Sequence, residues 1–176
     1  SDFRIEGVRQ ESDVVQYYSD SDHAGDRGVT KFSRTGTVIL LNSVPVHWRS
    51  VLQTRGIAVS SAVAEIYALY DTLKESQLYT WRCQEMGMDI NNPILIKVDN
   101  KQAESFTNST CANSRLRGTI DLREAWVKEL KDSDKVSVEY ISTRANVADL
   151  LTKAMREGRH KELLKLLGGR ERGDGD

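Results

Sequence analysis

The sequence predicts one α/β domain in which helices cover a mixed β-sheet. Two observations point to this fold class. Three β-rich stretches separated by turn residues come first, which is typical of an antiparallel meander. Helical periodicity then alternates with short apolar strands, which is typical of parallel strands joined by helices. A chain of 176 residues is long enough to form one such domain with its own core.

The predicted strands are rich in apolar, β-branched or aromatic residues. Asn42 and Ser43 form the turn between the second and third strands. Pro45 cannot donate a ladder hydrogen bond, so we expect the third strand at an edge of the sheet. The fourth strand is an almost continuous apolar run, which suits a buried parallel strand. The predicted strands span 14–20, 35–41, 44–49, 94–98 and 136–141.

The longest predicted element is a helix that starts near Ala62, because apolar residues then recur every three or four positions. Ser60 and Ser61 can cap its start, and Gly87 can end it. Further helices are predicted at 101–106, 120–131 and 145–155, and the basic, leucine-rich segment 156–167 extends the last of them. The expected order is βββ-α-β-α-α-β-α.

Composition excludes several classes of protein. Hydrophobic residues make up 39% and charged residues 29% of the chain, which argues against disorder over most of its length. No apolar run approaches the roughly 20 residues of a membrane helix. The net charge of −1 argues against tight binding of nucleic acid by charge alone. Cys83 and Cys111 have no metal-ligand spacing, so we expect a reducing compartment.

The ends of the chain differ from its middle. We expect residues 1–13 to be a linker or an arbitrary start, residues 14–167 to form the domain and residues 168–176 to be a disordered tail. Within the domain, we place all three tryptophans in the core: Trp48, Trp81 and Trp126.

Four acids fall where apolar elements end or begin. Asp20 and Asp99 end the first and fourth strands, Glu65 lies near the start of the long helix, and Asp149 lies near the start of the last. Functional groups of an open α/β sheet collect at the carboxyl ends of neighbouring strands. Four carboxylates together need cations, and ligands that are all oxygen suit Mg²⁺ or Mn²⁺. Two such ions about 3.5–4 Å apart are arranged for in-line attack on a phosphodiester.

Each acid taken alone has a simpler explanation: a strand-end turn, a favourable helix dipole, a helix N-cap or an exposed helix acid. An EF-hand starting at Asp20 is a further alternative. It fails because Ala24 and Lys31 occupy the fifth and twelfth positions of the loop, where the motif needs oxygen ligands, and because a strand precedes it. The coincidence of the four acids favours the metal site, with Asp22 as an outer neighbour and Asp26 as a loop residue.

Six segments, in order and with comparable spacing over about residues 14–155, carry a resemblance to a known family. They are YSDSDHAGD (18–26), SRTGT (33–37), VHWRS (46–50), AVSSAVAEIYAL (58–69), DNKQA (99–103) and ADLLTK (148–153). In these segments the chain resembles the ribonuclease H domain of the polyprotein of Ty1/copia-type LTR retrotransposons.

The resemblance implies a ribonuclease H-like fold: a five-stranded mixed sheet, three antiparallel strands and then two parallel ones, with helices on both faces. It implies hydrolysis of the RNA strand of RNA–DNA hybrids by a two-metal mechanism. The implied catalytic residues and metal ligands are Asp20, Glu65, Asp99 and Asp149, holding two Mg²⁺ ions for which Mn²⁺ can substitute. It also implies a reverse transcriptase fused to the domain or working beside it, no membrane, a monomeric isolated domain, and a cytoplasmic retrotransposon particle.

Two departures from the family pattern stand out. His23 replaces the usual tryptophan, so the loop after the first strand can pack differently. The segment 141–146 has no histidine before the last acid, unlike cellular and retroviral relatives, so turnover could be slow.

Nucleic-acid contacts are predicted at three places. Asn100 and Gln102, beside Asp99, could reach the 2′-hydroxyls that distinguish RNA from DNA. A second pair, Ser60 and Ser61, could bind a phosphate at a helix N-terminus, with capping as the equal alternative. The third pair lies in a polar loop and could touch phosphates or be solvated: Arg115 and Arg117.

Two rival functions remain open. One is a catalytically weak ribonuclease H-like scaffold or hybrid-binding module, against which the presence of all four acids argues. The other is an integrase or resolvase with the same sheet and a similar acid set, against which the continuous family pattern argues.

Overall fold

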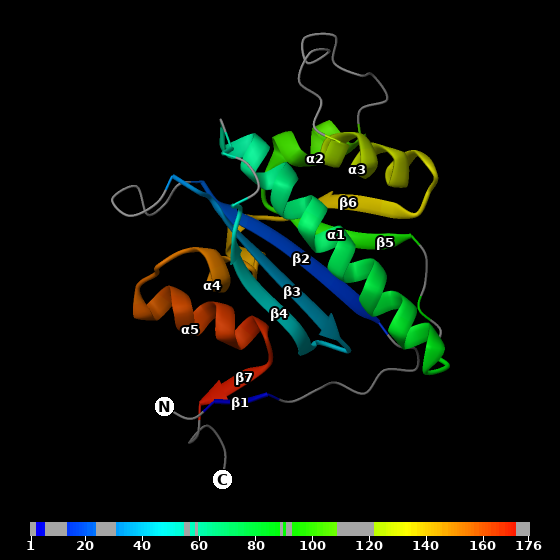
Figure 1. Ribbon diagram of the computed structural model, residues 1–176. Helices are drawn as coiled ribbons and strands as arrows, with labels where there is room; N and C mark the ends of the chain where they lie inside the picture. The colour runs from blue at the N-terminus through cyan, green and yellow to red at the C-terminus, as the bar shows by residue number, and fades with distance from the viewer. Residues whose placement is uncertain are drawn as a thin grey trace.

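A five-stranded mixed sheet forms the centre of the computed structural model, which describes residues 3–5, 14–23, 31–54, 57–58, 60–88, 90, 93–108 and 122–171 (Figure 1). The strand order is β4-β3-β2-β5-β6. β2, β3 and β4 pair antiparallel, and β5 and β6 continue the sheet in parallel. The predicted fold class and strand arrangement are confirmed. The strands span Val15–Asp22, Arg34–Leu41, Val44–Leu52, Ile94–Val98 and Val136–Tyr140.

The turn between β3 and β4 has the predicted residues. Asn42 and Ser43 have φ angles of 50° and 67°. A two-residue hairpin of this kind needs positive φ at both positions, which asparagine tolerates better than most residues. β4 is an edge strand, as Pro45 indicated, and its register with β3 shifts between Ile39 and Leu40.

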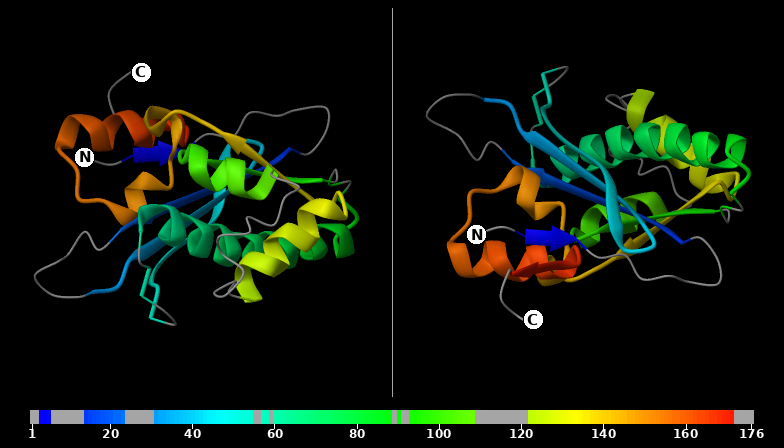
Figure 2. Two further views of the ribbon diagram at one scale, coloured as in Figure 1. Left: turned by 90° about the horizontal axis from the view of Figure 1, so that it is seen from above. Right: turned by 90° about the horizontal axis from the view of Figure 1, so that it is seen from below.

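Helices cover both faces of the sheet, as expected (Figure 2). On one side lie α1 (Ser61–Glu85) and α3 (Leu122–Asp132), and on the other lies α5 (Glu157–Leu166). The side chain of Ser60 caps α1 by accepting a hydrogen bond from the backbone N of Val63 at 3.3 Å. Gly87, at φ 79°, follows its last turn. The short helix α2 (Lys101–Asn108) contacts β6 and α1.

Successive residues of β2 serve different cores. Tyr17 belongs to the larger core, which β5, β6, α1 and α3 share. Tyr18 belongs to the smaller one, which includes Val147 and Ala148 at the approach to α4 (Asp149–Thr152). Because side chains alternate along a strand, the two cores lie on opposite faces of the sheet.

The stripe that α1 buries contains hydroxyl side chains that apolar periodicity could not reveal. Thr72 donates a hydrogen bond to Ser19 at 3.1 Å and shares one with Thr37 at 2.8 Å. The Thr80 and Tyr17 hydroxyls share a hydrogen bond at 2.6 Å. These polar groups can be buried because each has a hydrogen-bond partner.

The placement of two tryptophans in the core is wrong. Trp48 is 64% exposed on the edge strand, and Trp81 is 56% exposed, one position beyond the buried Thr80 on α1. Trp126 is partly buried and packs edge-on against Tyr70, with ring centroids 5.2 Å apart.

The predicted helix 145–155, extended through 167, is also wrong. The chain forms a 3₁₀ turn at Thr143–Ala145, the short helix α4, an extended residue at Lys153 and then α5 as a separate helix. The buried Asn146 explains the interruption. Its side chain donates to the carbonyl of Ser19 at 3.0 Å and accepts from the backbone N of Ala148 at 3.2 Å. Such side-chain bonds replace the backbone bonds of a helix.

Near its ends the chain forms a small second sheet, in which β1 (Phe3–Ile5) pairs antiparallel with β7 (Gly169–Glu171). The expectation of a linker at 1–13 and a disordered tail at 168–176 did not include this pairing, which joins positions far apart in the sequence. The domain limits at 14 and 167 stay a prediction. Among the described residues, no helix is both long and apolar enough to cross a bilayer.

Candidate metal centre

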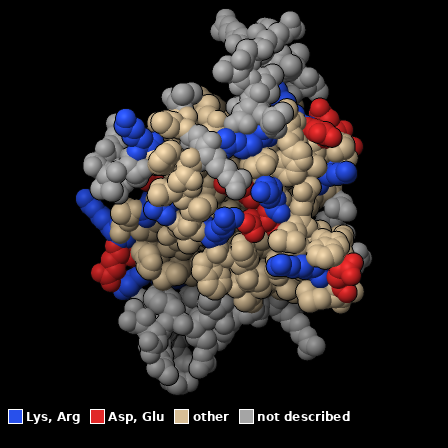
Figure 3. Space-filling view, viewed as in Figure 1, with Lys and Arg blue, Asp and Glu red and all other residues tan. Residues whose placement is uncertain are grey.

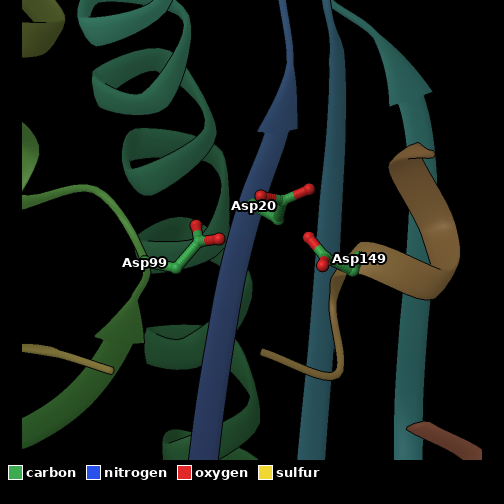
Figure 4. A group of neighbouring side chains, drawn as sticks. All are labelled: Asp20, Asp99 and Asp149. Carbon is green, nitrogen blue, oxygen red and sulfur yellow. The ribbon is translucent and has the colours of Figure 1, made fainter. Parts of the chain in front are cut away.

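Three carboxylates converge at one point of the sheet (Figure 4). Asp20 lies in β2, Asp99 directly follows β5, and Asp149 begins α4. β2 and β5 are parallel neighbours, paired up to Ser19 and Val98, so Asp20 and Asp99 follow side by side. One oxygen from each of the three carboxylates lies within 4.8 Å of the others. We call Asp20, Asp99 and Asp149 the acidic cluster.

A glycine lets α4 approach Asp20. Gly36 of β3 is paired with Asp20 across the sheet. A Cβ atom at Gly36 would lie 2.7 Å from Cγ2 of Thr152 and 2.8 Å from the carbonyl oxygen of Ala148. Any larger residue would therefore push α4 off the sheet. From β4, the Ser50 hydroxyl donates to the carbonyl of Leu151 at 2.6 Å and holds α4 in place.

Asp20 is fully buried. Three side chains contact either Asp20 or its neighbour Asp149. The Thr152 hydroxyl donates to Oδ2 of Asp20. Nζ of Lys153 lies 3.1 Å from Oδ1 of Asp20 and 2.7 Å from Oδ1 of Asp149. Nη2 of Arg159 lies 3.7 Å from Oδ2 of Asp149.

Burial raises the pKa of Asp20 to about 7, with Lys153 and Thr152 opposing the shift and Asp149 and Asp99 adding to it. For Lys153, burial alone would lower the pKa, but the attraction of Asp20 and its contacts with Asp149 raise it above its ordinary value. Lys153 is therefore a cation held between two acids.

Glu65 lies beside the acidic cluster, near the start of α1. Its side chain is buried, and Oε2 has no hydrogen-bond partner. Burial raises the pKa of Glu65 to about 8, and the charges of Asp20 and Asp99 raise it further. Glu65 is not one of the three residues whose oxygens lie within 4.8 Å of one another, but it is close enough for the charges of Asp20 and Asp99 to raise its pKa.

These residues fit a divalent cation. The donors are all oxygen, which suits Mg²⁺ or Mn²⁺. Oε2 of Glu65 is buried without a hydrogen-bond partner, and burial with mutual repulsion raises the pKa of Asp20 and Glu65, which disfavours their charged forms. A cation bound by Asp20, Glu65, Asp99 and Asp149 would relieve both.

The residues predicted to contact nucleic acid have different local roles in the structure. Asn100 accepts hydrogen bonds from the backbone N of Gln102 at 2.8 Å and of Ala103 at 3.1 Å, so Asn100 caps α2. The Asp99 carboxylate is thereby free of the capping role that the sequence left open. Gln102 is exposed.

The serine pair lies at the start of α1, where Ser60 is the cap and Ser61 the exposed first residue. Arg115 and Arg117 lie outside the described residues. Asp22, at the end of β2, is half-buried and is not part of the acidic cluster. Nε2 of His23 hydrogen-bonds the carbonyl of Ala58 at 3.1 Å, which ties the end of β2 to the approach to α1.

Sequence reasoning did not assign roles to Gly36, Thr152, Lys153 or Arg159. The first three lie inside the segments that carry the family resemblance, and their position in those segments was the available signal. Arg159 lies beyond them, and no local pattern marks it.

No family model matches the chain. It is 30% identical over 155 residues to the retrovirus-related Pol polyprotein from transposon TNT 1-94 of Nicotiana tabacum, a match that covers 88% of this chain and 11% of the polyprotein. It is 31% identical over 141 residues to the corresponding polyprotein from transposon RE2 of Arabidopsis thaliana, covering 78% and 9%. The chain thus spans about a tenth of the length of these relatives.

Solved structures agree on the fold. LC11-RNase H1 in complex with an RNA/DNA hybrid superposes with a TM-score of 0.56 at 16% identity, covering 79% of this chain and 94% of that one. RNase H1 from Halobacterium salinarum gives a TM-score of 0.50 at 18% identity, covering 78% and 93%. The chain is homologous to a segment of the Pol polyproteins of Ty1/copia-type retrotransposons, and its fold is that of ribonuclease H.

Proposed function

We propose that this domain is a metal-dependent endoribonuclease that hydrolyses the RNA strand of RNA–DNA hybrids during retrotransposon reverse transcription. The observation that carries the proposal is the convergence of Asp20, Asp99 and Asp149 at the carboxyl end of two parallel strands, with buried Glu65 beside them. The homology to Pol polyproteins supports the biological setting. The ribonuclease H fold of an enzyme crystallised with an RNA/DNA hybrid supports the substrate.

Each acid has a distinct place in the proposed centre. Asp20 lies between Asp99 and Asp149, so it can contribute oxygen to both halves (Figure 4). Glu65 and Asp99 would complete one half, and Asp149 would complete the other. Two divalent ions held there would supply activation of the attacking water and stabilisation of the leaving oxygen. The raised pKa values of Asp20 and Glu65 favour their protonated forms, and a bound cation would restore the charged forms that act as ligands.

The substrate must be held by groups around this centre, because the charge of the whole chain does not attract nucleic acid. Lys and Arg side chains are scattered over the face of α1 and are interrupted by acids (Figure 3). Exposed Gln102 and the α1 start at Ser60 and Ser61 are proposed contacts. Arg115 and Arg117 are further proposed contacts. A reverse transcriptase, fused or adjacent within a cytoplasmic particle, would supply the remaining contacts with the hybrid. This domain would act as a monomer.

Slow turnover is part of the proposal. Residues 141–146, Ile-Ser-Thr-Arg-Ala-Asn, contain no histidine that could move a proton before the last acid. The segment forms a 3₁₀ turn instead, whose carbonyls at Thr143 and Arg144 accept hydrogen bonds from Arg159 at 2.7 and 3.1 Å. This turn therefore orders the approach to Asp149 without offering a proton carrier.

A labelled RNA–DNA hybrid tests the proposal. The wild-type domain should cleave the RNA strand in Mg²⁺ or Mn²⁺, and Asp99→Asn should reduce cleavage to background while the circular dichroism spectrum is unchanged. Asp132→Asn, at an exposed acid that ends α3, is the matched control and should cleave as wild type does. Cleavage that survives the Asp99 change contradicts the assignment.

Two further outcomes separate the rival functions. Binding of the hybrid without cleavage at high protein concentration would favour a scaffold or hybrid-binding module. Cleavage of duplex DNA in place of the hybrid would favour an integrase-like or resolvase-like activity. Repeating the assay with the polymerase domain present shows whether weak cleavage reflects weak binding.

A further inference from the structure

The acidic cluster contains a lysine that lies between two of its carboxylates. Nζ of Lys153 donates hydrogen bonds to Oδ1 of Asp149 at 2.7 Å and to Oδ1 of Asp20 at 3.1 Å. At Lys153 the backbone leaves helical geometry, with φ −118° and ψ 135°. Its ammonium thus lies between the two carboxylates that flank one half of the proposed metal centre.

The remaining oxygens of these two acids also face donors from this chain. Oδ2 of Asp20 accepts from the Thr152 hydroxyl, and Oδ2 of Asp149 faces Arg159 at 3.7 Å. On the other side of Asp20 the environment differs. Within the described part of the chain, no ion pair is formed by Asp99 or Glu65, and an oxygen of Glu65 is buried without a partner. The two halves of the centre are therefore unequal.

We propose that Lys153 is a tethered counter-ion that competes with a divalent cation for the Asp20–Asp149 half of the centre. The inference rests on the proposed function, because it assumes a centre for two ions. An ammonium and a divalent ion cannot share these oxygens without repulsion, so the side chain must leave when the ion arrives. Lysine suits this exchange, since its head group is on a flexible stem and its side chain here is 36% exposed.

A fixed order of binding follows. The first ion enters the half formed by Asp20, Glu65 and Asp99, where Lys153 pairs with Asp20 alone and, among the described residues, Glu65 and Asp99 form no ion pair. The second ion binds more weakly, because it must displace Lys153 from two charge-assisted hydrogen bonds. Lys153 is in this sense a positioning residue: it sets the ion concentration at which the centre is complete and keeps Asp20 and Asp149 together below it.

The test is a titration of the full chain with Mn²⁺ alone, with free Mn²⁺ counted by electron paramagnetic resonance. Lys153→Met keeps an unbranched side chain that is one atom shorter and removes the charge. It should tighten the weaker site by roughly 5- to 150-fold, the usual range for coupling between two ligands. The tighter site should change by less than about threefold, well below that coupling range. Without divalent ions, Tm should fall, and Mn²⁺ should raise it more than in wild type.

The matched control is Lys161→Met. Lys161 also pairs with an acid four positions away, Glu157 at 3.0 Å, but on the exposed surface of α5. It should leave both Mn²⁺ sites unchanged. Lys153→Gln is the second variant in case the methionine variant does not fold, since its neutral amide can still donate to one carboxylate. It should tighten the weaker site in the same direction.

The outcomes separate this inference from the proposed function. Two Mn²⁺ sites that are the same in wild type and in both Lys153 variants overturn the inference and leave the nuclease proposal standing. Loss of the weaker site in the variants also overturns it, because Lys153 would then support the ion. Absence of any Mn²⁺ binding in wild type at millimolar concentration overturns both.

Discussion

Replacing Gly36 by alanine should separate α4 from the sheet. The added Cβ would lie 2.7 Å from Cγ2 of Thr152, 2.8 Å from the carbonyl oxygen of Ala148 and 3.2 Å from Cβ of Leu151. The carbonyl belongs to the backbone, so it cannot rotate away as a side chain could. Gly36 has no positive φ, so the alanine backbone itself is unstrained, and any loss comes from the clash.

The size of the effect follows from the cost of overpacking. Inserting a methyl group into a closely packed contact costs about 1–3 kcal/mol. A domain of this size loses roughly 2–4 °C in Tm for each kcal/mol, so Gly36→Ala should lower Tm by about 2–12 °C. Hybrid cleavage should fall further than the loss of stability explains, because a displaced α4 carries Asp149 and Thr152 away from Asp20.

Calorimetry and the hybrid-cleavage assay at a temperature well below both Tm values check this expectation. Gly158→Ala is the matched control, since nothing lies within 4 Å of a Cβ there and the site is in α5. That change should be neutral or stabilising by up to about 1 kcal/mol, because alanine favours a helix. If Gly36→Ala kept the wild-type Tm and activity, the close packing of α4 on β3 would be refuted.

Two other predictions concern stability. Because the folded protein raises the pKa of Asp20 to about 7 and of Glu65 to about 8, each keeps a proton that the unfolded chain releases above about pH 4.5. Without divalent ions the free energy of unfolding should fall between about pH 5 and 8, by up to about 1.4 kcal/mol per pH unit for each carboxyl. Urea unfolding across this range, with and without Mg²⁺, measures it, and a stability that rises with pH contradicts it. Asn146→Ala removes the bonds to Ser19 and Ala148 and should cost about 1–3 kcal/mol in the same assay; an unchanged urea midpoint would show that Asn146 does not hold this turn.

Much of the fold and the acidic cluster followed from local patterns. Asp20 and Asp99 were found because each follows an apolar stretch of a predicted strand, and parallel neighbouring strands run to the same edge; β2 itself continues two residues further, to Asp22. Pro45 and the turn at Asn42 and Ser43 located the edge strand and its hairpin in the same way. These predictions succeeded because each rests on a rule that relates a residue to its own element.

The failures involve residues whose surroundings come from distant parts of the chain. Trp81 has helical spacing, but the face that α1 buries passes through Thr80. Hydroxyls buried in that face look polar in the sequence, and only their partners on β2 and β3 explain them. Lys153 lies 133 positions from Asp20, so no window of sequence shows their contact.

The break before α4 connects the fold to the chemistry of the centre. A continuous helix over 145–155 would have fixed Asp149 and Lys153 on one helical face, pointing wherever that helix packed. The turn at Asn146 instead starts a single new turn of helix at Asp149, over the one position of β3 that lacks a side chain. The chain then extends at Lys153, and its ammonium reaches back to Asp20. The placement of the fourth acid and of its counter-ion thus depends on Asn146 and Gly36, neither of which contributes a carboxylate.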